Sequence, residues 1–254
     1  MADIEIEFAP PLARIRLNRP ERRNAVNKAM WLRLVGVAAE IEARPDVRAV
    51  LVEGAGGNFC AGADIFEFDE VFAAPGAAKD YLGAIEKGLT ALTLLDRPTI
   101  ALLEGNSIGG GLAIGMCCDL RFCADDAHLA VPPAKLGLLY GPVETRRLVE
   151  LIGLSRAKDL LFSGRRVEAS EALAIGLVDR RLAPATLRVE AESYANDLAR
   201  LSQTSIRDAK KMAAAVVRGG DDEYLRARIE EAVAGPDFKE GRTAFTEKRR
   251  PRFA

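Results

Sequence analysis

Two glycine-rich turns carry the residues best suited to chemistry in this sequence. Each follows a short apolar run that ends in Glu-Gly, at residues 50–54 and 100–105, and each precedes a helix-compatible stretch. Glycines at such turns let the backbone approach a ligand and leave unpaired N–H groups facing the opening, where helix N-termini add positive potential. If the two strands are neighbours, two N–H groups converge on one point. The turns at residues 55–65 and 106–113 therefore indicate an oxyanion hole built from backbone.

Two other motifs compete for these turns. The first turn lacks the third glycine of a dinucleotide-binding motif, because Phe59 stands in its place, and no P-loop Lys-Ser/Thr follows. Residues 105–109, Gly-Asn-Ser-Ile-Gly, do match the G-x-S-x-G nucleophile elbow. Its serine, Ser107, would have to recruit His128, the single histidine of the chain. A serine hydrolase is therefore an alternative.

The chain has four cysteines, at Cys60, Cys117, Cys118 and Cys123. They lack the C-x-x-C spacing that closes a zinc site, and adjacent cysteines point in different directions on a helix or a strand. We interpret them as small buried hydrophobic residues, and we expect no metal site.

Length and charge restrict the class of protein. The 254 residues suffice for one large domain, and 36 basic residues nearly balance 37 acidic ones. This balance offers no global field for nucleic acid or for an anionic membrane. Residues 1–7 are acidic, unlike a signal peptide, and no apolar run is long enough to span a membrane. We therefore expect a soluble, cytoplasmic protein.

Short apolar runs alternate with helical patterns in the first half of the chain. The runs at residues 12–17, 47–52, 98–103 and 118–123 are typical of buried strands. Between them, apolar residues recur at helical spacing in two stripes. These are Met30, Trp31, Leu34, Ala38 and Ile41, and Tyr81, Ile85, Leu89, Leu92 and Leu95. The order predicts an α/β core with a largely parallel sheet.

After about residue 142 the strand signals fade and helical segments follow one another. They cover residues 148–152, 155–162, 168–175, 185–201 and 205–217, and the chain ends in a basic tail. We predict a core over residues 1–190 that carries the functional site, and a C-terminal helical region over residues 191–254. No low-complexity linker separates the two, so we expect no independently mobile domain.

Five segments together resemble the crotonase superfamily, the enoyl-CoA hydratase/isomerase family, over almost the whole chain. They are residues 17–25 (LNRPERRNA), 59–65 (FCAGADI), 109–120 (GGGLA with CDL), 136–138 (LGL) and 244–249 (AFTEKR). The resemblance implies a spiral of ββα units with a helical C-terminal trimerisation layer, in a homotrimer or a dimer of trimers. It also implies an acyl-CoA substrate, and no cofactor beyond the coenzyme A of that substrate.

The resemblance also implies roles for single residues. By position, Ala63 and Gly110 supply the oxyanion N–H groups, and Ala61, Ala63, Asp64 and Ile65 line the path of the adenine and pantetheine. Arg23 and Lys248 fit the places of basic contacts to the coenzyme A phosphates, Lys248 from a neighbouring subunit, and Phe245 of the tail motif is assigned to the same site. These are local cations for a polyanion on a nearly neutral protein.

The sequence departs from the family pattern at the catalytic carboxyls. Where hydratases of this family carry two glutamates, this chain has Ala113 and Pro133, and an alternative carboxylate position falls on Gly141. None of these side chains can transfer a proton, yet hydration needs a base for water and an acid for the α-carbon.

Two nearby residues are substitutes. Glu144, near the start of a helix whose dipole is expected to lower its pKa, is a candidate acid or base for hydration or isomerisation. Tyr140 matches a tyrosine of decarboxylating relatives, although those relatives have histidine at the position of Ala63. Three interpretations therefore stay open, namely a hydratase or isomerase using Glu144, a decarboxylase using Tyr140, and a non-catalytic acyl-CoA binder.

Overall fold

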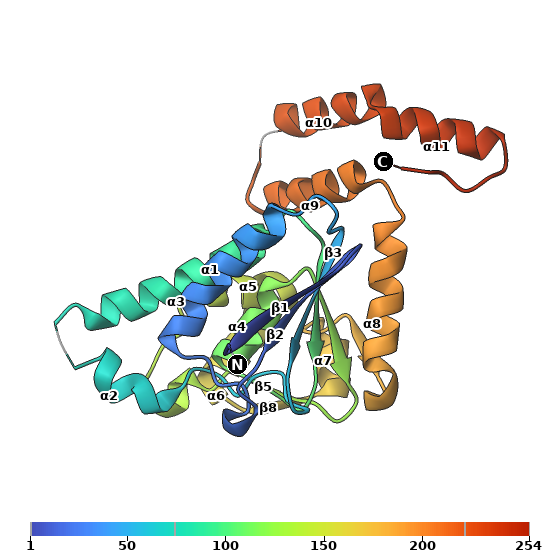
Figure 1. Cartoon of the computed structure of the whole chain (residues 1–254). Helices are drawn as coiled ribbons and strands as arrows, with labels where there is room; N and C mark the ends of the chain where they lie inside the picture. Colours follow the sequence, from blue (N-terminus) through green and yellow to red (C-terminus); the bar gives the residue numbers. More distant parts are fainter. Residues whose placement is uncertain (1, 74, 221, 254) are drawn as a thin grey trace.

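A six-stranded sheet forms the centre of the protein in the computed structural model, which describes residues 2–73, 75–220 and 222–253 (Figure 1). Its strand order is β1-β2-β3-β4-β6-β9, and every pair is parallel except β1 with β2. The strands are β1 (Ile4–Ala9), β2 (Leu12–Leu17), β3 (Ala49–Gly54), β4 (Thr99–Leu103), β6 (Leu120–Ala124) and β9 (Arg180–Leu182). The predicted largely parallel sheet is confirmed, with its four predicted strands shifted by at most two residues.

A second, three-stranded sheet contains β5 (Asn106–Ile108), β7 (His128–Ala130) and β8 (Arg166–Glu168). The chain twice passes from the large sheet to the small sheet and then into helices. The first passage runs through β4, β5 and α4 (Gly110–Cys117), and the second runs through β6, β7, η3 (Pro133–Leu136) and α5 (Pro142–Ile152). These repeated passages are the ββα units of the predicted spiral.

Helices α1 (Lys28–Glu42) and α3 (Ala77–Leu94) lie side by side next to the sheet, and α3 also packs on α4 (Figure 1). Asn27 caps α1, because its side-chain oxygen accepts a hydrogen bond of 2.8 Å from the Met30 N–H. The two backbones approach closely at Gly88, where a Cβ would lie 2.6 Å from the Trp31 carbonyl oxygen. Both predicted apolar stripes face the core. The short helix η1 (Pro20–Arg22) precedes α1, and η2 (Ile65–Glu67) and α2 (Phe68–Val71) lie between β3 and α3.

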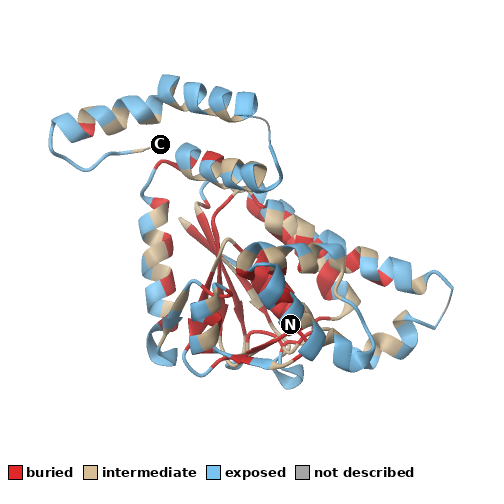
Figure 2. Cartoon of the chain, turned by 180° about the vertical axis from the view of Figure 1, so that it is seen from behind, coloured by how far each residue is buried: buried red, intermediate tan, exposed pale blue. Residues whose placement is uncertain are grey.

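The C-terminal half is largely helical, as predicted. It contains α6 (Leu154–Ser163), α7 (Ala169–Ile175), α8 (Pro184–Ala199), α9 (Gln203–Val217), α10 (Asp222–Ala234) and α11 (Pro236–Thr246). Helix α8 covers one face of the large sheet, whereas α10 and α11 extend beyond the body and are mostly exposed (Figure 2). The predicted boundary at residue 190 falls within α8, and the division into two regions stays a prediction.

The expectation that strands end near residue 142 was wrong. Strands β8 and β9 follow, and β9 completes the edge of the large sheet by pairing with β6. Each has only three residues and two charged side chains, Arg166 and Glu168 in β8 and Arg180 and Arg181 in β9. Without an apolar run there is no local strand signal, so tertiary pairing alone defines these strands.

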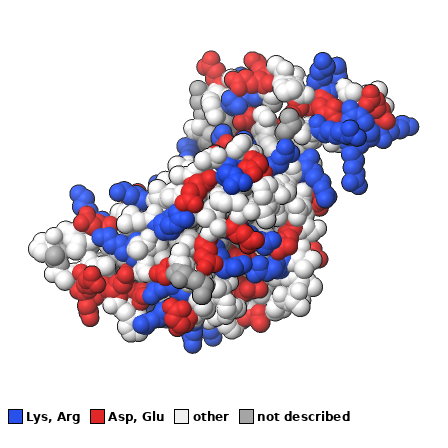
Figure 3. Space-filling view, viewed as in Figure 1, with Lys and Arg blue, Asp and Glu red and all other residues white. Residues whose placement is uncertain are grey.

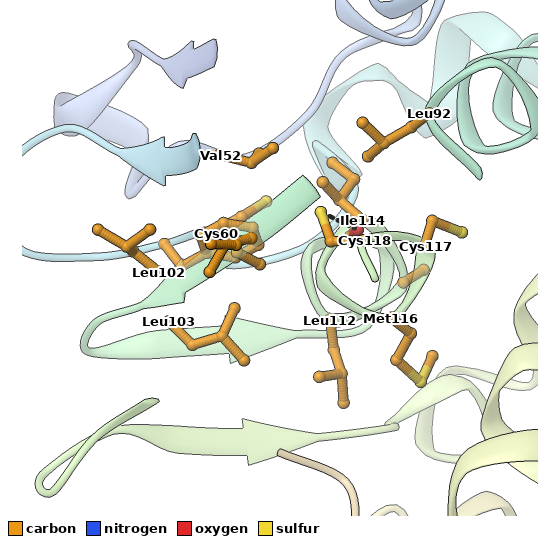
Figure 4. Close-up of a cluster of buried hydrophobic side chains, with 14 of the residues drawn as sticks. Val52, Cys60, Leu92, Leu102, Leu103, Leu112, Ile114, Met116, Cys117 and Cys118 are labelled. Carbon is orange, nitrogen blue, oxygen red and sulfur yellow. Dashed lines mark hydrogen bonds between the residues drawn. The ribbon is translucent and has the colours of Figure 1, made fainter. Parts of the chain in front are cut away.

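All four cysteines lie in the hydrophobic core, where Cys60, Cys117 and Cys118 are surrounded by apolar side chains (Figure 4). Burial raises the pKa of the Cys60 thiol to about 12 and that of Cys117 to about 11. In the described ranges, no three His, Cys, Asp or Glu side chains gather in a way that could hold a metal ion. The cysteines therefore act as core residues.

Across residues 2–73, 75–220 and 222–253, no helix has the length and apolar character needed to cross a bilayer.

Candidate active site

The first glycine-rich turn is fixed by two strand-like bridges. Cys60 bridges to Ser107, and Ala63 bridges to Val26. In the second bridge, Val26 N–H donates to the Gly62 carbonyl at 2.8 Å, and Asp64 N–H donates to the Val26 carbonyl at 2.9 Å. Because successive N–H groups of an extended chain point to opposite sides, the Ala63 N–H faces away from Val26.

The second turn places the start of helix α4 against the first. Gly109, just after β5, has φ 52° and ψ −120°, a left-handed conformation that a side chain would strain. Gly110 then begins α4, so its N–H has no acceptor within the helix. A Cβ on Gly110 would lie 3.4 Å from the Ala63 nitrogen and 3.1 Å from Cζ2 of Trp31. A side chain at Gly110 would therefore crowd the Trp31 ring next to the Ala63 nitrogen.

Ala63 and Gly110 lie at the wall of one cavity of about 170 Å³. In the described part of the chain, neither N–H donates to a backbone or side-chain acceptor. Most of the lining is apolar. It comprises Trp31, Ala61, Gly62, Ala63, Ile65, Phe68, Phe72, Tyr81, Leu82, Ile85, Ile108, Gly109, Gly110, Pro132, Pro133, Leu136, Leu138, Leu139, Tyr140, Gly141 and Glu144. The structure thus brings the candidate residues Ala61, Ala63, Ile65, Gly110, Tyr140 and Glu144 together at one cavity.

Glu144 is a buried carboxyl in this cavity, in the first turn of α5 and 8% exposed. Its oxygens lie against Gly141, where a Cβ would be 2.7 Å from Oε2. Burial raises the pKa of Glu144, although backbone hydrogen bonds from Glu144 itself and from Gly141 oppose this shift. The predicted lowering of its pKa was wrong, because desolvation outweighs the stabilisation by the helix N-terminus.

Tyr140 is half-buried, and its hydroxyl donates a hydrogen bond of 2.7 Å to the Gly109 carbonyl oxygen. Burial raises the pKa of Tyr140, and the negative charge of Glu144 raises it further. The phenol therefore stays protonated at ordinary pH and acts as a donor.

The two positions at which the family resemblance implies glutamate, 113 and 133, differ in their surroundings. Pro133 lines the cavity, and it begins the short helix η3. Ala113 is fully buried in α4 and belongs to the hydrophobic core. A carboxyl at position 133 would face the cavity, whereas one at position 113 would replace a core methyl group.

Asp64 stabilises the first turn through its side chain. It is 5% exposed, and it accepts hydrogen bonds from Arg19 Nη1 at 3.0 Å and from Phe66 N–H at 3.2 Å. The Arg19 guanidinium also donates to the Ala25 carbonyl at 2.8 Å. These contacts anchor the chain directly after Ala63.

The predicted phosphate contacts lie apart within one chain. Arg23 is exposed, and its carbonyl accepts a hydrogen bond of 2.9 Å from Ala61 N–H, which holds it beside the first turn. Phe245, which is 86% exposed, and Lys248 lie at the C-terminal end of α11. This end is far from α2, which follows the first turn along the chain (Figure 1). Many Lys and Arg side chains gather on the part of the surface formed by α11 and the tail (Figure 3). The structure of one chain therefore unites Arg23, but not Phe245 or Lys248, with the first turn.

The serine hydrolase motif is not assembled. Ser107 is fully buried, and its hydroxyl has no hydrogen-bond partner among the described residues. His128 instead lies 3.2 Å from Glu168 Oε2 through Nδ1, at the surface. The nucleophile elbow thus lacks an exposed serine and its base.

Apart from Tyr140, the aromatic residues of the cavity were not predicted as site residues. Phe68, Phe72 and Tyr81 pack edge to face, with ring centroids 5.2 to 6.2 Å apart. Trp31 lies against Gly110. Their helical stripes marked Trp31 and Tyr81 as core residues, and core and cavity wall have the same sequence signal. Phe68 and Phe72 come from the segment 66–78, of which residue 74 lies outside the described residues.

Comparisons with known proteins agree with this architecture. A sequence model of the enoyl-CoA hydratase/isomerase family matches residues 7–254. The chain is 34% identical over 252 residues to the short-chain-enoyl-CoA hydratase of Clostridium acetobutylicum, covering 98% of this chain and 96% of that protein. It is 33% identical over 258 residues to the crotonyl-CoA hydratase of Syntrophomonas wolfei, covering 99% of this chain and 97% of that protein.

Two solved structures are similar over their full length. One is an enoyl-CoA hydratase/isomerase family protein from Hyphomonas neptunium, with a TM-score of 0.97, 40% identity and coverage of 100% of this chain and 98% of that one. The other is an enoyl-CoA hydratase from Bacillus anthracis, with a TM-score of 0.91, 29% identity and 99% coverage of both chains. This chain therefore belongs to the enoyl-CoA hydratase/isomerase family and has the crotonase fold.

Proposed function

We propose that this protein is an acyl-CoA isomerase, in which Glu144 transfers a proton while the N–H groups of Ala63 and Gly110 hold the thioester oxygen. One observation carries the proposal. Among the described residues that line the cavity, Glu144 has the only carboxyl group, and burial raises its pKa. A raised pKa makes the carboxylate a stronger base and keeps the proton available for return.

The proposed reaction needs one proton-transfer group. In a 3-enoyl thioester, the Glu144 carboxylate removes a proton from carbon 2, and the electron pair of that C–H bond delocalises onto the thioester oxygen. Two N–H donors stabilise this oxyanion. The neutral Glu144 then returns the proton to carbon 4, and the double bond ends between carbons 2 and 3. Atoms balance without water, whereas hydration requires a second group to activate water.

The cavity favours a short acyl group. An apolar cavity of 150 Å³ holds a benzene molecule, so the present volume of about 170 Å³ accommodates an acyl chain of about six carbons. Its walls offer apolar contact rather than polar recognition.

The coenzyme A moiety and the assembly are proposed from charge and exposure. We propose that Arg23, which lies beside the first turn, contacts a phosphate of the coenzyme. We propose that Phe245 and Lys248 reach the same moiety from a neighbouring subunit of a homotrimer or a dimer of trimers. Exposed Ile229, Val233 and Phe238 on α10 and α11 support such contact, since apolar side chains on projecting helices favour a covering partner. Sedimentation of the intact protein tests this assembly.

Mass spectrometry in heavy water tests the reaction. The protein is incubated separately with crotonyl-CoA, a short 3-enoyl-CoA and methylmalonyl-CoA, and product mass and deuterium content are followed. The proposal is supported if the 3-enoyl-CoA is converted to an isomer that has not gained a water molecule, and if Glu144→Gln abolishes this conversion.

Other outcomes assign another function. Hydration of crotonyl-CoA as the main activity would overturn the single-carboxyl mechanism. Loss of CO₂ from methylmalonyl-CoA that depends on Tyr140 would identify a decarboxylase. Binding of the esters without turnover or exchange would identify a non-catalytic acyl-CoA binder.

A further inference from the structure

The Gly109 carbonyl receives two hydrogen bonds from opposite parts of the site. Tyr140 O–H donates to it at 2.7 Å, and Ala113 N–H donates at 3.0 Å. A carbonyl oxygen has two lone pairs, so both are occupied. The helical bond from Ala113 is a normal part of α4, whereas the bond from Tyr140 comes from a segment about thirty residues further along the chain.

This carbonyl belongs to the same peptide group as the Gly110 N–H. In a trans peptide the C=O and N–H point in opposite directions within one plane, so fixing the oxygen also fixes the direction of the N–H. Gly109 itself, at φ 52° and ψ −120°, has no side chain to restrict rotation of this peptide. A strong donor on the oxygen also polarises the amide and strengthens its N–H as a donor.

We infer that Tyr140 is a positioning residue, whose hydroxyl holds and polarises the Gly109–Gly110 peptide so that the Gly110 N–H is aimed at the thioester oxygen. The inference rests on the proposed function, because it assumes that this N–H belongs to the oxyanion hole. It assigns Tyr140 a role different from contact with the acyl group, since its single proton is already engaged by Gly109.

The same bond also sets the position of the acid–base group. Tyr140 immediately precedes Gly141, the N-cap of α5, and Glu144 lies in the first turn of that helix. At the other end of α4, Arg147 Nε donates to the Met116 carbonyl at 2.9 Å. The Arg147 bond thus joins α5 to α4 directly, whereas the Tyr140 bond joins the residues just before the two helices and acts on the proposed oxyanion peptide.

The test is Tyr140→Phe, which removes the hydroxyl and keeps the ring. Vibrational spectra of bound crotonyl-CoA, labelled with carbon-13 at the thioester carbonyl, report how strongly the site polarises that bond. We expect the wild-type protein to lower the carbonyl stretching frequency and the variant to lower it clearly less. For isomerisation of a 3-enoyl-CoA, we expect kcat to fall about tenfold, the worth of one good hydrogen bond, with KM changed by less than about twofold.

Two further variants sharpen the result. Arg147→Gln removes the direct bond between α4 and α5, and we expect it to lower stability while leaving the carbonyl frequency and kcat unchanged. Tyr140→3-fluorotyrosine has a more acidic hydroxyl and is a stronger donor, so the carbonyl frequency should fall below the wild-type value. This variant keeps the ring and hydroxyl, and tests the inference even if Tyr140→Phe does not fold.

An equal carbonyl shift in wild type and in both Tyr140 variants would overturn the inference and leave the proposed function standing. A raised KM with unchanged kcat in Tyr140→Phe would also overturn it, because the hydroxyl would then bind substrate. No shift in the wild-type protein, or no binding of the ester, would overturn the oxyanion hole and the proposed function together.

Discussion

The two walls of the cavity are built by different means. One wall, formed by residues 60–63 and 108–111, consists of backbone in close contact, where a Cβ on Gly111 would lie 2.4 Å from the Cys60 carbonyl oxygen. The other wall, residues 132–144, presents side chains from η3, from the loop that follows it and from the first turn of α5. Leu139 there is 92% exposed and Leu136 57% exposed. The backbone wall is fixed by packing and strand pairing, whereas the side-chain wall has room to vary.

This difference separates two parts of the proposed chemistry. The proposed oxyanion donors are backbone N–H groups, so their positions depend on the backbone path that glycines allow and not on a reactive side chain. The acid–base group comes from a side chain, so a single substitution can remove or replace it without disturbing the sheets. In the proposed mechanism, the backbone wall therefore activates the thioester, and the opposite wall determines which reaction follows.

The largest effect is expected from Glu144→Gln on the side-chain wall. Loss of a general acid–base group typically costs 10²–10⁴-fold, so we expect kcat for isomerisation to fall about 10³-fold. Steady-state kinetics with a 3-enoyl-CoA measures this. Glu150→Gln on the same helix is the control, because Glu150 does not line the active-site cavity.

The pH dependence of Glu144 follows from the raised pKa. Its folded-state pKa lies above the ordinary value of 4.5, so the folded protein holds this proton more tightly than the unfolded chain does. As pH rises from 4.5 through the raised pKa, ionisation of Glu144 therefore lowers the free energy of unfolding. Below pH 4.5 the carboxyl is protonated in both states, and this loss is absent. Glu144→Gln should be at least as stable as wild type at neutral pH, and any advantage should vanish in acid. Thermal melts over pH test the sign, and a less stable variant at neutral pH would contradict it.

On the backbone wall, Gly109→Ala is the strongest test. A Cβ there meets no atom closer than 3.7 Å, so the cost arises from the backbone angles and not from a clash. We expect the Gly109–Gly110 peptide to turn and kcat to fall about 10²-fold, near the value for loss of one oxyanion donor. Gly137→Ala on the other wall, also at positive φ with no neighbour within 4 Å, is the matched control. It should cost about 1 kcal/mol of stability and little activity. Equal activity loss in both variants would refute the distinction between the walls.

A gain of activity is expected from Pro133→Glu, which adds a second carboxyl to the side-chain wall. Leu138 N–H donates to the carbonyl of Pro133 at 2.9 Å, and this bond is kept by the substitution. If hydration lacks only a second acid–base group, the rate of crotonyl-CoA hydration should rise about tenfold. This is less than the usual contribution of an acid–base group, because the new side chain is not optimally positioned. Absorbance of the conjugated thioester follows the reaction. An unchanged rate together with retained isomerisation would show that more than a carboxyl is missing.

The smallest effect is expected from Ser107→Ala, beneath the backbone wall. Its buried hydroxyl has no partner among the described residues, so its removal should change stability by at most about 1 kcal/mol, in the stabilising direction. Isomerisation and thioester hydrolysis should both match wild type. A large loss of either activity would restore the serine hydrolase interpretation.

The sequence alone predicted most of the fold and the composition of the cavity's backbone wall. Short apolar runs and helical stripes marked the parallel core and the faces of α1 and α3, because burial imposes periodic patterns. Family motifs marked the residues around Ala63 and Gly110, since glycine at a positive φ or at a close approach leaves a recognisable signal.

Only the tertiary structure decided how these parts meet. Strands β8 and β9 have no apolar signal and exist because their neighbours offer hydrogen bonds. The raised pKa of Glu144 arises from surroundings distant in sequence, which reverse the effect expected from its own helix. The hydrogen bond from Tyr140 to Gly109 likewise joins two segments, and neither local sequence predicts the other as its partner. Local patterns report backbone preference and burial, whereas electrostatics and hydrogen-bond partners depend on which segments folding brings together.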